Sequence, residues 1–143
     1  MSGATPSFDL STPAGERAAG RIAHEKVIWL TTVNPDGSPQ SSPVWYLWDG
    51  SNFLVYSRES ARVANIQAHP QVGMNLDGNG EGGDIVVIEG IAHIEKSRPG
   101  VPENPAYLDK YGAAIAGYNW TPEWMAEHYP VPVVITPTKF RYW

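Results

Sequence analysis

The sequence contains no cysteine, few basic residues and no long hydrophobic run, and each absence excludes a class of protein. Without cysteine there is no disulfide framework and no thiolate chemistry, which fits a reducing compartment. Ten Lys and Arg against 15 Asp and Glu give a net charge of −5, so no broad basic face for nucleic acid is expected. No apolar run approaches the roughly 20 residues of a membrane span, and the N-terminus lacks a signal-peptide pattern. We therefore expect a soluble, cytoplasmic protein without a membrane span.

Two kinds of catalytic pattern are also missing. The four histidines, His24, His69, His93 and His128, show no pair at the spacing typical of zinc ligands, so no metal site is expected. Ser41 and Ser42 lie in no nucleophile elbow and have no local base, which argues against hydrolysis.

Glycine and proline are plentiful, at 14 and 13 of 143 residues, and they divide the chain into many short elements. One domain over residues 1–143 is expected, with residues 1–11 as a flexible arm. β-branched and aromatic runs predict strands at 27–33, about 38–48, 53–57, about 71–76, 85–95 and 131–143, the first three forming a meander. The pattern favours a small antiparallel barrel over a sandwich or a parallel sheet.

Capping signals predict the helices between these strands. Thr12 followed by Pro13 indicates a helix that reaches about residue 24. Ser60, the apolar pair Val63 and Ile66, and Pro70 indicate a second, short helix. Two more helical segments are expected at 106–118 and 121–128.

The glycine-rich segment "DGNGEGGD" at 77–84 suggests a phosphate cradle or a calcium loop, and neither hypothesis fits well. It carries three acidic residues and leads into a strand, whereas a phosphate loop opens a helix. As a calcium loop it has Ile88 where a bidentate glutamate is needed. We expect a flexible hairpin.

The segment "YSRESARVAN" at 56–65 combines hydroxyls, guanidinium groups and a helix start. Ser57 and Arg58 end a strand, Ser60 can cap the helix, and Arg62 lies in its first turn. Such groups can bind a phosphate, although a capped surface helix with solvated arginines has the same sequence pattern.

The stretch "SSPVWYLWDG" at 41–50 places a proline among three aromatic residues within a predicted strand. Proline cannot donate to a strand ladder, so Pro43 is expected to interrupt it and leave backbone groups free for a ligand. Trp45, Tyr46 and Trp48 can serve as a flat wall for a ring, as core or as interface, and the sequence does not apportion these roles.

The order of "LTTVNPDGSPQSSPVWYLWDGSNFLVYS", "RESARVANIQAHPQVGMNL" and "IVVIEGIAHI" resembles the split barrels of the pyridoxamine 5'-phosphate oxidase and flavin reductase-like superfamily. It is more similar to the branch that uses the deazaflavin coenzyme F420. The resemblance implies a six-stranded antiparallel split β-barrel that forms a homodimer with two cofactor sites at its interface. It places the cofactor ring against Pro43, Val44 and Trp45. It also places the phosphate at Ser57, Arg58, Arg62 and Asn65; many relatives have lysine where Arg62 stands.

By this resemblance the protein is an oxidoreductase that transfers a hydride from reduced F420 to an electron-poor small substrate such as an enone, quinone or tetrapyrrole. Tyr46 or a tyrosine of the C-terminal region is a candidate proton donor, and none is assigned as catalytic. FMN is the alternative cofactor, although its sites usually hold more basic residues than Arg58 and Arg62. A non-catalytic protein that binds the cofactor would share every motif.

Overall fold

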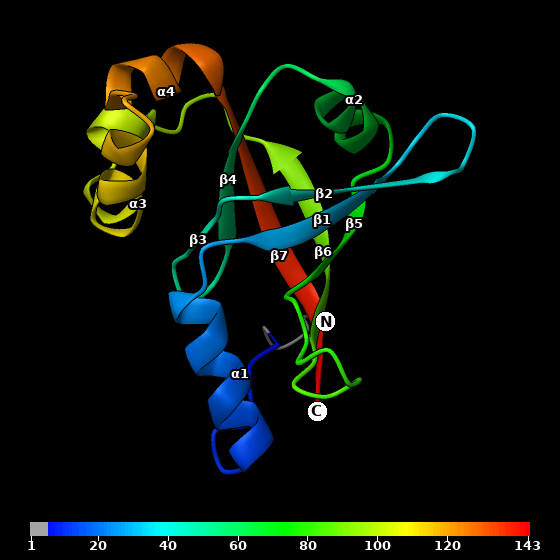
Figure 1. Cartoon of the computed structure of the whole chain (residues 1–143). Helices are drawn as coiled ribbons and strands as arrows, with labels where there is room; N and C mark the ends of the chain where they lie inside the picture. Colours follow the sequence, from blue (N-terminus) through cyan, green and yellow to red (C-terminus); the bar gives the residue numbers. More distant parts are fainter. Residues whose placement is uncertain (1–5) are drawn as a thin grey trace.

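Seven antiparallel strands form one curled sheet within residues 6–143, the part of the chain that the computed structural model describes, in the order β2-β1-β5-β6-β7-β4-β3 (Figure 1). The sheet is a half-barrel, which is consistent with the predicted split barrel. The strands are β1 Ile28–Val33, β2 Pro39–Val44, β3 Leu47–Trp48, β4 Phe53–Ser57, β5 Gln71–Asn75, β6 Val86–Ile94 and β7 Val131–Tyr142.

The four α-helices of residues 6–143 begin close to the positions that the sequence predicts. Thr12, Asn104 and Thr121 each accept a hydrogen bond from a backbone N–H in the first turn, and a proline follows each of them at the first helical position. Ser60 precedes the remaining α-helix but makes no side-chain cap bond. The helices are α1 Pro13–His24, α2 Ala61–Ala68, α3 Pro105–Gly117 and α4 Pro122–His128, with a short 3₁₀ turn at Val101–Glu103.

The predicted strand at 38–48 is wrong in one respect, because it is two strands at opposite ends of the sheet. β2 pairs with β1, β3 pairs with β4, and β4 pairs with β7. The first three predicted strands therefore do not form a meander, and the described chain has seven strands where six were expected. Trp45 and Tyr46 carry the chain from one edge of the sheet to the other.

Side chains of α3 hold this crossing in place. The Tyr111 hydroxyl accepts from Tyr46 N at 2.9 Å and lies 2.7 Å from the carbonyl oxygen of Lys26 and 3.0 Å from that of Tyr46. Lys110 Nζ donates to the same Tyr46 carbonyl at 2.8 Å. These bonds satisfy backbone groups that lose their ladder partners where β2 ends, so the strand can break at a buried position.

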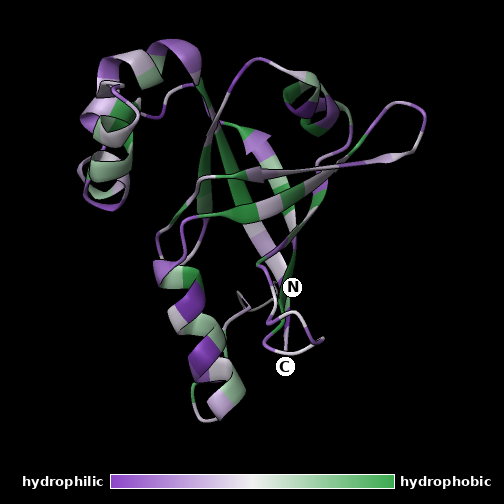
Figure 2. Ribbon diagram, viewed as in Figure 1, coloured by the Kyte–Doolittle hydropathy of each residue, from purple (hydrophilic) through white to green (hydrophobic). Residues whose placement is uncertain are grey.

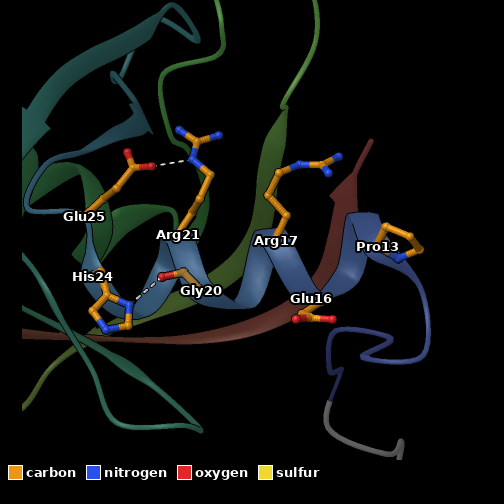
Figure 3. A pocket seen from close by; sticks show the side chains of 7 residues that line it. All are labelled: Pro13, Glu16, Arg17, Gly20, Arg21, His24 and Glu25. Atoms are coloured by element: carbon orange, nitrogen blue, oxygen red, sulfur yellow. Dashed lines mark hydrogen bonds and ion pairs between the residues drawn. The ribbon is translucent and has the colours of Figure 1, made fainter.

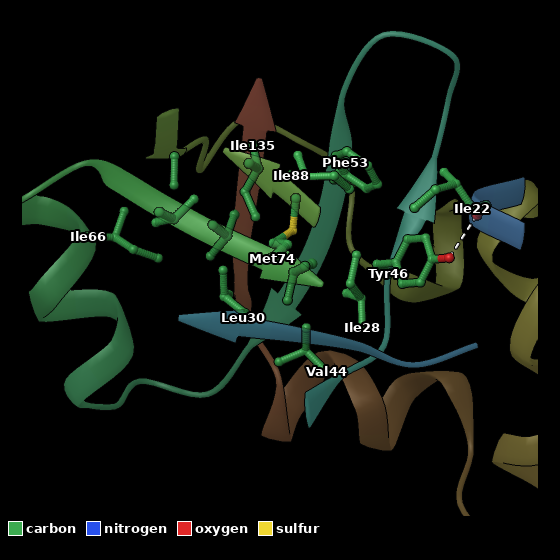
Figure 4. Close-up of a cluster of buried hydrophobic side chains, with 14 of the residues drawn as sticks. Ile22, Ile28, Leu30, Val44, Tyr46, Phe53, Ile66, Met74, Ile88 and Ile135 are labelled. Atoms are coloured by element: carbon green, nitrogen blue, oxygen red, sulfur yellow. Dashed lines mark hydrogen bonds between the residues drawn. The ribbon is translucent and has the colours of Figure 1, made fainter. Parts of the chain in front are cut away.

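Two hydrophobic cores lie on opposite faces of the sheet. The inner core fills the curl with large aliphatic and aromatic side chains, including Ile28, Phe53 and Ile135 (Figure 4). The outer core packs Leu54 and Tyr56 of β4 against α3 and α4. β4 is consequently buried at all five positions. Hydrophobic residues are concentrated on the central strands, whereas hydrophobic and hydrophilic residues alternate along α1 (Figure 2).

Part of the predicted N-terminal arm is fixed to the domain. The Phe8 ring stacks on Phe140 of β7 with centroids 4.3 Å apart, and Asp9 N donates to the Tyr142 hydroxyl at 2.7 Å. The first five residues of that arm lie outside the described residues. The segment at 77–84 joins β5 to β6 as a hairpin, as predicted, and Arg21 of α1 donates to two of its carbonyl oxygens.

None of the helices in residues 6–143 has the length and apolar character needed to cross a membrane. In the same part of the chain, no three His, Cys, Asp or Glu side chains are grouped so that they could hold a metal ion.

Candidate functional site

A cavity of about 560 Å³ lies between the barrel and the helical segment that contains α3 and α4. Two walls of different character enclose it. The barrel wall is formed by Val27, Gln40, Ser42, Pro43, Val44, Trp45, Tyr56, Arg58, Ser60 and Arg62, and the helix wall by Tyr107, Tyr118, Trp120, Met125 and Tyr129.

Arg62 is the half-buried charge of the barrel wall. Its guanidinium donates to Ser57 Oγ at 3.1 Å and to Ser42 Oγ, so it bridges the end of β4 and the edge strand β2. Burial lowers the pKa of Arg62, and the nearby Tyr129 opposes this shift. A guanidinium remains charged at neutral pH because its ordinary pKa is far above 7, so desolvation favours a bound anion.

Arg58 is exposed and is held by one residue of the helix wall. Its Nη2 donates to the Tyr129 hydroxyl at 3.2 Å, and its guanidinium carbon lies 4.9 Å from the centre of the Tyr129 ring. This cation–π contact and hydrogen bond direct the exposed side chain toward the cavity.

Neither arginine has an acidic partner among residues 6–143. The ion pairs in that range join Arg17, Arg21, Arg98, Arg141 and His93 to carboxylates. No Asp or Glu is among the described residues that line the cavity. Two cations thus converge without a carboxylate in a chain of net charge −5, an arrangement that suits an anionic ligand.

The structure brings five of the seven predicted site residues to the cavity, and Ser57 and Asn65 lie behind its wall. Ser57 is fully buried and positions Arg62. The Asn65 amide donates to oxygens of Thr32, Asn34 and Gln40 at 2.9 to 3.2 Å, so it ties α2 to the β1–β2 hairpin.

Pro43 does not interrupt its strand. β2 pairs with β1 continuously from Pro39 to Val44, with Pro43 opposite Trp29. Proline is tolerated because β2 is an edge strand, whose outer side has no strand neighbour among the described residues. This open edge lines the cavity through Gln40, Ser42, Pro43 and Val44.

The aromatic residues of the 41–50 stretch divide between cavity and core. Trp45 lines the cavity and stacks on Tyr111 of α3, with centroids 4.5 Å apart and ring planes within 4°. Tyr46 is buried in the inner core and donates its hydroxyl hydrogen to Ile22 O at 2.7 Å. Tyr46 is therefore not available as a proton donor to a ligand in the cavity. Trp48 packs on Phe53.

No individual residue of the helix wall was predicted from the sequence. Tyr107 and Tyr56 are buried, and burial raises the pKa of each hydroxyl, so both stay protonated at neutral pH. Tyr56 donates to Pro99 O at 2.8 Å. The concentration of aromatic residues at 107–129 was the signal in the sequence, but it did not reveal which sheet face the helices cover.

A second hollow, of about 590 Å³, lies along α1 and is a weaker candidate (Figure 3). Its lining comes from this helix and its C-terminal end alone. Its two arginines are already paired, since Arg21 contacts Glu25 and Arg17 contacts Asp84. His24 Nδ1 lies 2.9 Å from Gly20 O, at hydrogen-bond distance.

Solved structures of proteins described as binding different ligands have the same fold as this chain. A protein described as an F420 reductase is 24% identical, with a TM-score of 0.63 over 85% of this chain and 94% of that chain. An FAD-binding protein from Mesorhizobium loti is 18% identical, with a TM-score of 0.62 over 89% and 90%. A heme storage protein from Vibrio cholerae is 13% identical, with a TM-score of 0.58 over 89% and 89%. At these low sequence identities, the structural similarity establishes the fold alone.

No curated protein sequence matched the chain. Residues 14–143 match the family model described as pyridoxamine 5'-phosphate oxidase. That match runs from α1 to the end of β7 and includes both walls of the cavity. The chain therefore belongs to the pyridoxamine 5'-phosphate oxidase family.

Proposed function

We propose that this protein is an oxidoreductase that binds reduced coenzyme F420 and transfers a hydride from it to an electron-poor small molecule such as an enone, a quinone or a tetrapyrrole. One observation carries the proposal: Arg58 and Arg62 converge on the cavity with no carboxylate partner among the described residues. The similarity to an F420 reductase supports the choice of cofactor.

The residues present fit a phosphate-bearing ring cofactor. Arg62, fixed by two serines, and Arg58, fixed by Tyr129, would hold the phosphate by charged hydrogen bonds. Ser60 precedes α2 and makes no side-chain cap bond, so its hydroxyl and the first N–H groups of the helix can serve the same anion. The ring would lie along Pro43, Val44 and Trp45.

The reduced cofactor supplies the hydride, and the protein supplies binding, orientation and a site with little water. The open edge of β2 offers backbone groups to the polar side of a ring. The helix wall covers the cavity with aromatic surface and holds reactants close. Tyr129 is the tyrosine of the wall whose hydroxyl faces the arginines, and no residue is assigned as the proton donor.

We further propose that two copies of the chain pair in the cytoplasm, with a cofactor at each of two sites on their interface, and that neither nucleic acid nor a membrane is a partner. The open β2 edge and the exposed Val27 beside the cavity are suited to a contact between copies. A monomeric mass in solution at working concentration would contradict the pairing.

The decisive experiment titrates F420 and FMN separately into the purified protein. F420 is expected to bind with the lower Kd, in the micromolar range or below. Tighter binding of FMN would mean that the flavin, and not the deazaflavin, is the cofactor of this site. If neither binds at micromolar concentration, both cofactor proposals fail.

A binding protein without catalysis is the competing function, and the FAD-binding and heme storage neighbours make it concrete. Turnover separates the two. The protein loaded with reduced F420 is mixed with a panel of enones, quinones and tetrapyrroles, and oxidation of the cofactor is followed by absorbance. Binding without oxidation by any acceptor would favour the storage function.

A further inference from the structure

The helix wall ends in a column of stacked aromatic rings whose free end lies in the cavity. Tyr118 stacks on Trp120 with centroids 4.6 Å apart and ring planes at 22°. Trp120 stacks on Trp124 at 4.4 Å and 17°, and Trp124 stacks on His128 at 4.0 Å and 19°. Tyr118 and Trp120 line the cavity, whereas the other two rings do not.

Core packing does not account for Tyr118. Tyr118 is 61% exposed in a single copy of the chain although one face of its ring rests on Trp120, so much of the remaining ring surface is uncovered there. Exposed aromatic surface at the mouth of a cavity is typical of a binding site.

The backbone turn between α3 and α4 builds this arrangement. Asn119 has a positive φ of 60°, and the Trp120 N–H donates back to Ile115 O at 3.0 Å. This left-handed turn ends α3 and lets the rings on either side of Asn119 stack. The next rings of the column support Trp120 from behind, so the Tyr118 face is preorganised for a flat ligand.

The charge of the cavity limits what can stack there. Its lining within the described residues holds two arginines and no carboxylate, so a cationic ring is disfavoured relative to a neutral or anionic one. A cofactor ring on the barrel wall would leave the helix wall for the second reactant, and hydride transfer requires the two to lie face to face in near contact.

We propose that the exposed face of Tyr118 is the subsite for the hydride acceptor, and that it selects planar rings without positive charge. This inference rests on the proposed function, because it assigns the barrel wall to the cofactor. The acceptor ring extends the Tyr118–Trp120 column by one member and lies between Tyr118 and the cofactor site.

The test measures acceptor binding independently of turnover. Protein loaded with oxidised cofactor cannot reduce an acceptor, so equilibrium dialysis gives the Kd of naphthoquinone in this dead-end complex. Tyr118→Leu removes the ring, and the Kd of naphthoquinone is expected to rise roughly threefold to tenfold while the cofactor Kd stays within a factor of two. Tyr118→Phe keeps the ring and is expected to bind like the parent. Trp143→Leu is the matched control, an aromatic residue that is 58% exposed and outside the cavity lining.

A quinoline and its N-methylated cation, compared as competitors of naphthoquinone, test the charge preference, and the neutral ring is expected to compete more strongly. Equal naphthoquinone binding by Tyr118→Leu and the parent overturns the subsite. A parallel loss of cofactor affinity in Tyr118→Leu also overturns it, because the column would then hold the cofactor ring. If the parent binds neither cofactor, the proposed function itself fails, and this is seen before any variant is made.

Discussion

Arg58 and Arg62 are held so differently that they are expected to serve one anion in different ways. Arg62 is half-buried and bonded to two serines on separate strands, so its position is set by the barrel. Arg58 is exposed, and the described contacts of its side chain are with Tyr129 of the helix wall. Arg62 therefore provides the fixed part of an anion site, and Arg58 provides a part whose position depends on the helical segment.

Replacing Arg62 with alanine is expected to weaken binding of a phosphate-bearing cofactor by about 1.5 to 3 kcal/mol, the usual size of a hydrogen bond to a charged group. Arg62→Lys keeps the charge but loses the planar fork, so an intermediate affinity is expected. Isothermal titration with FMN measures the loss, and riboflavin, which lacks the phosphate, is the control ligand. A similar loss for riboflavin would mean that Arg62 supports the fold of the site and does not bind phosphate.

Tyr129 is expected to act on the cofactor through Arg58. Tyr129→Phe keeps the ring beside the guanidinium and removes one hydrogen bond, so the FMN affinity is expected to fall by about 0.5 to 1.5 kcal/mol. Tyr129→Leu removes the cation–π contact as well and is expected to cost more. The affinities are compared with those of Arg58→Ala, in which the same Tyr129 substitutions should have little further effect. Additive losses in the double variants would contradict the coupling.

Single residues of the site could be predicted where the signal is local in the chain. Arg58, Ser60 and Arg62 lie within five residues of one another, next to a strand end and a helix start, so their convergence is visible in the sequence. Tyr129 contacts Arg58 although the two residues are 71 positions apart in the sequence, and no local sequence pattern predicts such a contact. Asn65 was included because of the family resemblance, yet its amide is turned toward the β1–β2 hairpin.

At the scale of elements, the strand at 38–48 shows why composition gives an element's type more readily than its partners. Its β-forming residues correctly predicted strand on both sides of Trp45. The break depends on the Tyr111 hydroxyl and the Lys110 ammonium group, which reach the Tyr46 backbone from a helix 64 to 65 residues away. Pro43 was expected to interrupt its strand. It instead lies in an edge strand whose pairing with β1 is continuous.

The turn between α3 and α4 gives a prediction at the same scale. Asn119 adopts a left-handed conformation that asparagine tolerates and most other residues do not. Asn119→Ala is therefore expected to lower the free energy of unfolding by about 1 kcal/mol, whereas Asn119→Gly should be close to neutral. Urea unfolding followed by circular dichroism measures both. Equal stability of the alanine variant and the parent would show that the turn relaxes without strain.

The whole molecule joins a barrel and a helical segment through one densely packed contact, and the cavity is a consequence of that junction. The outer core packs β4 against α3 and α4, and Tyr111 and Lys110 add polar bonds at the β2 to β3 crossing. Both walls of the cavity come from segments held by this contact. A substitution or a change of charge at the junction is therefore expected to alter the free energy of unfolding of the whole domain. Lys110 is the titratable group best placed to report it.

Lys110 is expected to make stability rise with pH in the mildly alkaline range. Burial, assisted by the nearby charge of Lys26, lowers the pKa of Lys110 from 10.5 to about 8. Between about pH 8 and 10.5 the unfolded chain therefore binds more protons at this site, so the free energy of unfolding increases with pH. The gain is on the order of 1 kcal/mol, because the Lys110 side chain is only partly buried and solvent screens its charge.

Urea unfolding at intervals from pH 7.5 to 9.5, roughly the window of this titration, measures that slope. Lys110→Met should lose it, and Lys96→Met, at an exposed lysine, should retain it. The raised pKa values of the buried Tyr46, Tyr107 and Tyr111 act in the opposite direction, since the unfolded tyrosines ionise first near pH 10, and stability should fall above that pH. An identical slope in Lys110→Met and the parent would place the alkaline titration elsewhere and leave Lys110 as a solvated charge on the surface of α3.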